Sequence, residues 1–250
     1  CKLLFFKNRF LTTPYHSMPE INFHQIDCMD FMRALPDKAY ELAIVDPPYG
    51  LDLANMNMGI GKSKKASKKE NRKWEPKDWD KATPDATYFE ELRRVSKNQI
   101  IWGGNYFDLP PCLNYVIWDK EIPEGLSFAD CELAWTSFKN APKMFRYSAY
   151  LDKKTKQHPT QKPVALYRWL LENYAKPGDR ILDTHGGSMS SAIACHDLGF
   201  DLDICELDPD YFKAGKERFE RHVNRWAGLD LMIADTNDYS NLNTGLFAQQ

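Results

Sequence analysis

The sequence predicts an α/β fold built around a mostly parallel sheet, and two observations support this prediction. Short apolar segments with the length of buried strands alternate with segments of helical period along most of the chain. Glycine- or proline-containing turns separate these segments at the points where a strand would have to stop. With 250 residues, 43% hydrophobic and 27% charged, the chain is long enough for one large soluble domain.

The first elements are justified by apolar pattern and by proline. Residues 21–27 read as a strand and residues 28–35 as a helix with its apolar side chains on one face. Residues 41–46 (ELAIVD) form a continuous apolar run of the length of a buried parallel strand. The turn at 47–50 (PPYG) ends it, because two prolines continue neither a strand nor a helix. Residues 51–81 lack periodicity, so we expect a long mobile loop there.

The middle and C-terminal elements follow the same logic. A helix at 84–95 begins near a proline, and a buried strand at 98–102 is closed by two glycines. Helix 163–175 carries five apolar or aromatic residues on one face and ends before Pro177-Gly178. The remaining expected strands are 115–118, 131–138, 144–150, 180–183 and 201–206, and the remaining helices are 189–198 and 209–226.

Composition excludes several classes of protein. No run of eighteen apolar residues is present, which predicts no membrane span. The six cysteines form no C-x-x-C pair, so we expect reduced thiols in a cytoplasmic protein and no metal site. Residues 1–17 precede Met18 and are expected to be a loose arm or to lie outside the natural protein. Residues 231–250 are expected to be a C-terminal tail.

The charge is unevenly distributed. The chain has a net charge of −2, yet residues 61–81 contain nine Lys or Arg against four Asp or Glu, and residues 139–156 contain six against one. Two basic segments on an acidic body could hold a phosphate backbone on one face, and solvated lysine loops are the alternative.

A cofactor site is indicated in the C-terminal third. A strand ending at Asp183 runs into a glycine-containing turn, and the next strand ends at Glu206, 19 residues after Gly187. An acid at this position binds ribose hydroxyls in nucleotide-binding α/β folds. The G-x-G-x-x-G fingerprint is absent and Asp183 would repel a pyrophosphate, so an adenosyl ligand with a cationic methionine tail fits better than a dinucleotide. A plain turn between strand and helix is the alternative.

Asp46-Pro47-Pro48-Tyr49 is the strongest chemical signal in the chain. Methylation of an exocyclic base amine requires acceptors for the two N–H groups, so that the nitrogen lone pair points at the methyl donor. The Asp46 carboxylate and the Pro47 carbonyl can serve as these acceptors, and Tyr49 offers a face on which a flipped base can stack. A proline-rich turn with an exposed tyrosine is the alternative.

With these motifs, the chain resembles the DNA amino-methyltransferases over about residues 18–226. Asp46 to Tyr49 resembles the catalytic motif of this family, and residues 183–188 (DTHGGS) resemble its cofactor loop. Residues 25–28 (QIDC) resemble the segment that contacts the cofactor adenine, and residues 158–163 (HPTQKP) resemble the motif beside the methionine end of the cofactor. The motif order is similar to that of the permuted β-type group. The D-T-H-x-G-S variant of the loop is similar to that of phage and prophage orphan adenine methyltransferases, and it departs from the usual D-P-F-x-G-x-G.

The resemblance implies a seven-stranded, Rossmann-like sheet with helices on both faces, in a methyltransferase domain at 18–230 with basic, DNA-recognising insertions at about 51–83 and 139–157. It implies S-adenosylmethionine as cofactor, duplex DNA as partner, base flipping at a short target, and a monomer or weak dimer. The implied catalytic residues are Asp46, Pro47, Pro48 and Tyr49. The implied cofactor-binding residues are Asp27, Cys28, Asp46, His158, Thr160, Gln161, Lys162, Asp183, His185, Gly186, Gly187, Ser188, Glu206 and Leu207. The implied DNA-binding residues are Lys64, Lys65, Lys68, Lys69, Arg72, Trp74 and Arg146.

Several alternatives stay open. Asp at position 46 favours N6 of adenine as the acceptor, while the same chemistry serves N4 of cytosine. Methylation of RNA or of a protein amide is a second alternative, and a non-catalytic DNA-binding remnant is a third. Gln161 and Lys162 either steer the carboxylate of the methyl donor or make hydrogen bonds at the entry of the helix. His185 either contacts the cofactor or caps the turn.

Overall fold

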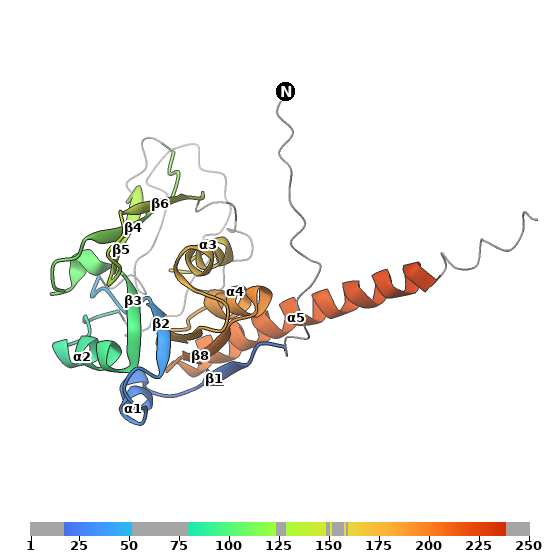
Figure 1. Ribbon diagram of the computed structural model, residues 1–250, viewed down its shortest axis with the longest axis horizontal. Helices are drawn as coiled ribbons and strands as arrows, with labels where there is room; N and C mark the ends of the chain where they lie inside the picture. The colour runs from blue at the N-terminus through green and yellow to red at the C-terminus, as the bar shows by residue number, and fades with distance from the viewer. Residues whose placement is uncertain are drawn as a thin grey trace, which may run out of the picture.

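A computed structural model describes residues 18–51, 80–123, 129–148, 151, 158 and 160–238 of the chain (Figure 1). The strands are β1 (Ile21–His24), β2 (Tyr40–Val45), β3 (Ser96–Trp102), β4 (Asn114–Asp119), β5 (Cys131–Thr136), β6 (Lys143–Arg146), β7 (Arg180–Asp183) and β8 (Asp201–Cys205). The helices are α1 (Cys28–Arg33), α2 (Ala86–Val95), the 3-10 turn η1 (Gly104–Tyr106), α3 (Val164–Tyr174), α4 (Ser190–Leu198) and α5 (Pro209–Asp238).

The strands form one sheet in the order β1-β8-β7-β2-β3-β5-β4-β6. Every neighbouring pair is parallel except the two pairs that involve β5, so β5 alone runs against the others. The α/β prediction is therefore confirmed. The sheet has eight strands where the family resemblance implied seven.

Helices cover both faces of the sheet, because strand side chains alternate between the faces. In β2, Leu42 and Ile44 point into a core shared with α3 and α4, whereas Ala43 and Val45 point into a second core shared with α1 and α2. Figure 1 shows these two pairs of helices on opposite sides of the strands. This alternation explains why β2 is apolar throughout.

Several boundaries differ from the sequence prediction. The first strand ends at His24 and not at residue 27, because Asp27 caps α1 by accepting a hydrogen bond from the amide of Met29 at 2.7 Å. The last helix continues to Asp238 and so includes part of the segment expected as a tail. Among the described residues, no helix combines the length and apolar character needed to cross a bilayer.

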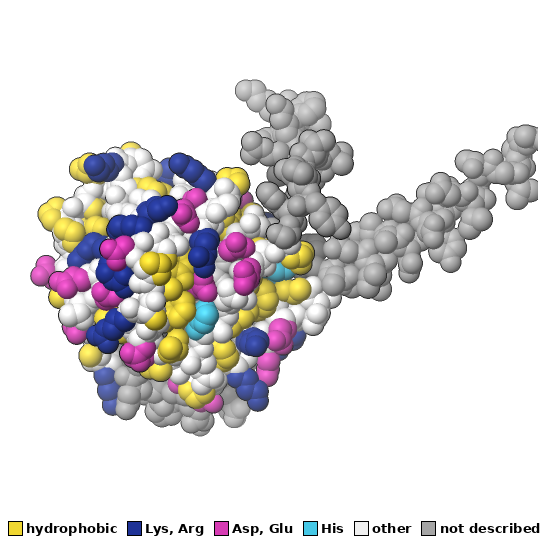
Figure 2. Space-filling view, turned by 60° about the horizontal axis from the view of Figure 1, so that its bottom comes forward, with side chains coloured by type: hydrophobic (Ala, Val, Ile, Leu, Met, Phe, Trp, Pro, Cys, Tyr) yellow, Lys and Arg dark blue, Asp and Glu magenta, His cyan; other side chains and the backbone are white. Residues whose placement is uncertain are grey.

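The face shown in Figure 2 carries basic and acidic side chains intermingled around a band of apolar ones. The basic segment 61–81 lies outside the described residues, except for Asp80 and Lys81.

Candidate active site

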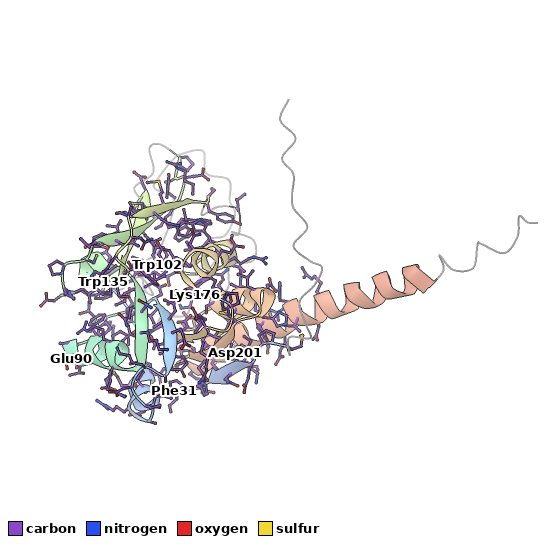
Figure 3. All side chains as sticks on the ribbon, in the orientation of Figure 1. Phe31, Glu90, Trp102, Trp135, Lys176 and Asp201 are labelled. Atoms are coloured by element: carbon purple, nitrogen blue, oxygen red, sulfur yellow. The ribbon has the colours of Figure 1, made fainter. Side chains whose placement is uncertain are left out.

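The site lies along the edge of the sheet where the parallel strands end. Asp46 follows β2, Gly103 follows β3, Asp183 ends β7 and Glu206 follows β8. Carboxyl ends of parallel strands are the usual place for ligand sites in open α/β sheets. Figure 3 marks Trp102, the last residue of β3, with Trp135 of β5 nearby. Because β5 runs the opposite way, its first residues reach this same edge.

A cavity of about 520 Å³ opens at this edge, a size suited to a small organic cofactor. Every residue expected to bind the cofactor lines it, with the single exception of Asp183. From the expected catalytic motif, Asp46 and Pro48 line it. The further lining residues are Ile26, Tyr167, Thr184, Ser190, Asp208, Pro209 and Tyr211.

Glu206 fixes the loop on one side of the cavity. Its Oε2 atom accepts a hydrogen bond from the amide of Gly187 at 2.7 Å, and its Oε1 atom accepts one from the amide of Asp208 at 2.9 Å. Burial raises the pKa of Glu206, and these amide hydrogen bonds oppose the rise. Each carboxylate oxygen keeps a second lone pair that can accept a hydrogen bond from a ligand hydroxyl.

The two glycines of the loop are required for different reasons. A Cβ on Gly186 would lie 2.9 Å from both Ile204 Cγ1 and Met189 Sδ, so this glycine is needed for packing beneath the loop. Gly187 has a φ of +49°, in the left-handed region that L side chains rarely adopt.

Asp183 lies behind the wall of the cavity. It is buried, and its carboxylate accepts hydrogen bonds from the Ser191 hydroxyl at 2.6 Å and the His185 amide at 3.0 Å. Burial raises the pKa of Asp183 to about 7, against these two hydrogen bonds. In this structure the carboxylate therefore holds the turn between β7 and α4.

His185 and His158 stand on the cavity wall. Burial lowers the pKa of His185 to about 4, so its imidazole is neutral at pH 7 and shares a hydrogen bond of 2.9 Å with the Thr184 hydroxyl. The His158 ring packs edge-on against Tyr211 at 4.3 Å between centroids and lies within hydrogen-bonding distance of Thr160.

Asp46, Tyr49 and Lys162 meet at the cavity wall, which Asp46 and Lys162 line. The Tyr49 hydroxyl donates to Asp46 Oδ1 at 2.6 Å, and Lys162 Nζ lies 2.5 Å from Asp46 Oδ2 and 3.1 Å from the Tyr49 oxygen. Burial raises the pKa of Asp46, and the ammonium of Lys162 opposes that rise. The carboxylate is thus held in place by two donors.

Two residues that the sequence did not single out, Tyr106 and Gly103, pack against the Tyr49 ring. The Tyr49 ring stacks on Tyr106 with 5.0 Å between centroids and an interplanar angle of 18°. Its edge packs on Gly103, where a Cβ would lie only 2.2 Å from Tyr49 Cε1. Aromatic rings and glycines occur throughout the chain, so no local pattern could have singled out these two.

Asp80 is a third missed residue. It is buried and accepts hydrogen bonds from the amides of Tyr49 at 2.8 Å and Gly50 at 3.0 Å. Asp80 therefore fixes the backbone just after the Pro47-Pro48 turn from a segment that sequence reasoning assigned to DNA contact.

A comparison with protein families identifies a DNA methylase domain over residues 102–217, which runs from the end of β3 into α5. This match covers a little less than half of the chain and makes that segment similar to the DNA methylases. Among curated relatives, the type II methyltransferase M.HpaI of Haemophilus parainfluenzae is 34% identical over 86 residues, which is 34% of this chain and 27% of that one. The chain thus matches only about a quarter of the length of M.HpaI.

Other relatives match over most of their length. The methylase YubD of Escherichia coli is described as putative and is 23% identical over 78% of this chain and 88% of its own. The solved M1.HpyAVI–SAM complex has a TM-score of 0.51 at 19% identity, and covers 79% of this chain and 99% of its own. The cytosine-N4-specific PvuII DNA methyltransferase has a TM-score of 0.52 at 14% identity, and covers 84% and 93%. These two structures share the fold of this chain.

The expected DNA-binding residues divide by position in the chain. Arg146 ends β6, with its guanidinium largely exposed and its Nε 3.3 Å from Asp119 Oδ2. The others, Lys64, Lys65, Lys68, Lys69, Arg72 and Trp74, lie outside the described residues.

Proposed function

We propose that this protein transfers a methyl group from S-adenosylmethionine to the exocyclic amine of a base in duplex DNA, with N6 of adenine as the acceptor. The observation that carries the proposal is the position of Asp46. Its carboxylate lines the same cavity as Glu206, so an acceptor for a base amine and an acceptor for ribose hydroxyls face one small-molecule site.

The residues of the cavity fit the proposed cofactor. Glu206 keeps lone pairs for the ribose hydroxyls, while Asp27 and Ile26 line the wall beside them. His158 and Gln161 belong to the H-P-T-Q-K-P motif and line the cavity, and we assign them to the methionine end of the cofactor. When bound, the cofactor supplies a methyl group already activated as a sulfonium.

The residues of the chain then act by position. Asp46 accepts one N–H of the amine and the carbonyl of Pro47 accepts the other, which turns the nitrogen lone pair toward the methyl donor. Tyr49 provides a ring face for a base taken out of the duplex. Asp46 can accept the amine while Tyr49 and Lys162 remain bound, because each carboxylate oxygen has two lone pairs.

We assign the two basic segments at 61–81 and 139–156 to the DNA backbone. Both lie between the catalytic motif and the H-P-T-Q-K-P motif, and both carry a large excess of Lys and Arg over Asp and Glu. Arg146 is the one expected DNA-binding residue that the structure describes, and its exposed guanidinium is available to phosphate.

Incubation with S-adenosylmethionine and unmethylated duplex DNA, followed by digestion to nucleosides and mass analysis, tests the proposal. N6-methyl-2′-deoxyadenosine is the expected product, and N4-methyl-2′-deoxycytidine would assign the other amine.

Asp46→Ala should reduce transfer at least about 100-fold while cofactor binding persists, because Lys162 keeps Glu132 as a partner at 3.1 Å. Asp30→Ala is the control, since that carboxylate is exposed on α1. A fully active Asp46→Ala variant would refute the assignment.

A further inference from the structure

Glu132 is a charged residue beside the active site that the proposed chemistry does not use. It is the second residue of β5, the strand that runs against its neighbours. Because of that reversal, the beginning of β5 lies where the other strands end, and Glu132 pairs in register with Trp118 near the end of β4. The reversed direction of β5 thus places a carboxylate from the start of this strand at the catalytic edge, where the other strands end.

Glu132 is bound by two ammonium groups. Its Oε2 atom is buried and makes no hydrogen bond of good geometry, but it forms an ion pair with Lys162 Nζ at 3.1 Å, while its Oε1 atom lies 2.7 Å from Lys120 Nζ. Lys162 is in turn 2.5 Å from Asp46 Oδ2. The four groups therefore alternate in charge in the order Asp46, Lys162, Glu132, Lys120.

Lys162 needs this arrangement because it is almost completely buried, with 2% of its side chain exposed. Burial alone would lower the pKa of Lys162, but Asp46 and Glu132 raise it. The ammonium also lies between two rings, 5.3 Å from the centroid of Trp102 and 5.5 Å from that of Tyr49.

The same network determines the state of Glu132. Burial would raise the pKa of Glu132, but Lys162 and Lys120 hold it at about 2, so the group is ionised throughout the neutral range. Asp46 and Lys162 line the cavity, whereas Glu132 does not. Glu132 therefore acts from behind the cavity wall, by its ion pair with Lys162 and by its charge, which raises the pKa of Asp46.

We propose that Glu132 is a positioning residue for methyl transfer, which holds the Lys162 ammonium together with Asp46 and so fixes the Asp46 carboxylate that receives the base amine. Without Glu132, the flexible lysine stem would lose one of its two ion pairs, and the ammonium could move onto the atoms that the amine must reach. This inference rests on the proposed function.

Glu132→Gln tests the inference, since it removes the charge and keeps the shape. Glu90→Gln is the matched control, because Glu90 is exposed on α2, away from Trp102 (Figure 3). The readouts are the single-turnover rate of methyl transfer to DNA at saturating cofactor, the Kd for S-adenosylmethionine by calorimetry, and the thermal unfolding midpoint. For Glu132→Gln we expect a rate roughly 10- to 100-fold lower with a cofactor Kd within about twofold of wild type.

Two further variants separate positioning from loss of structure. Glu132→Asp retains the charge on a shorter stem and should recover part of the rate. If Glu132→Gln does not fold, Lys120→Met replaces it, because this change releases Glu132 from the outer end of the network, and a slowed transfer with normal cofactor binding is again expected. Wild-type rates in the folded Glu132→Gln or Lys120→Met variant would overturn the inference. A wild-type protein that methylates no DNA would instead overturn the proposed function.

Discussion

Replacing Gly103 by alanine should separate the cost of backbone strain from the cost of displacing Tyr49. Gly103 has a φ of +71°, and an L residue in this region costs about 1–2 kcal/mol. The new Cβ would also lie 2.2 Å from Tyr49 Cε1, so the ring must move by at least about 1.2 Å to reach ordinary van der Waals contact. That movement strains the hydrogen bond of 2.6 Å from Tyr49 to Asp46 and the one of 3.1 Å from Lys162 to Tyr49.

Gly199→Ala is the matched control, because Gly199 has a φ of +76° but nothing within 4 Å of the added Cβ. We expect Gly199→Ala to lose about 1–2 kcal/mol of unfolding free energy, and Gly103→Ala to lose a further ~1–2 kcal/mol through its weakened hydrogen bonds. Urea denaturation measures both losses, and the single-turnover rate should fall roughly 100-fold only in Gly103→Ala. Equal losses of stability in both variants, together with a wild-type transfer rate in Gly103→Ala, would refute the reasoning.

Two other predictions concern charge. The pKa of Asp183 is raised to about 7, so the native state binds more protons than the unfolded state between about pH 4 and pH 7. The free energy of unfolding should therefore fall as pH rises through that window. Urea denaturation from pH 5 to 8 should show a flatter pH dependence for Asp183→Asn, and an unchanged slope would contradict this prediction. Charge reversal of Lys64, Lys65 and Lys68 should weaken DNA binding and reduce the slope of log K against log salt by up to about 3, as titrations at several salt concentrations would show, whereas an unaltered slope would place these lysines away from phosphate.

The parts of the fold that the sequence predicts are those encoded locally. Strand β2 could be found because its apolar run is continuous and Pro47-Pro48 ends it, and α3 could be found from its helical period. The acids Asp46 and Glu206 could be placed at one edge, because parallel strands align their carboxyl ends. Each of these inferences rests on the local pattern of one strand or helix and of the residue that follows it.

What the sequence could not predict depends on the direction of one strand and on distant contacts. Residues 131–138 read as a strand, but apolar pattern does not reveal whether a strand is parallel or antiparallel to its neighbours, so Glu132 could not be placed at the active edge. Lys162 contacts Asp46 across more than 100 positions of the sequence, although sequence reasoning assigned it to the donor carboxylate or to the helix entry. Asp80 likewise contacts a distant residue, Tyr49, and it lies in a segment whose composition indicated only a basic loop.

The ion network at the active site is better explained by function than by stability. Removing charges from water is costly, and apolar side chains of similar volume often stabilise a protein as well as a buried ion pair does. Lys162 nevertheless lines the cavity with its ammonium 5.3 Å from the centroid of the Trp102 ring, a position where packing alone would favour a hydrophobic side chain. Asp46 has to stay ionised in a largely buried site, and the charged form of Lys162 lowers the pKa of Asp46. Glu132 raises the pKa of Lys162 and so keeps that ammonium charged, although its own charge also raises the pKa of Asp46. The reversed strand β5 supplies this second carboxylate, which gives the exception in an otherwise parallel sheet a chemical role.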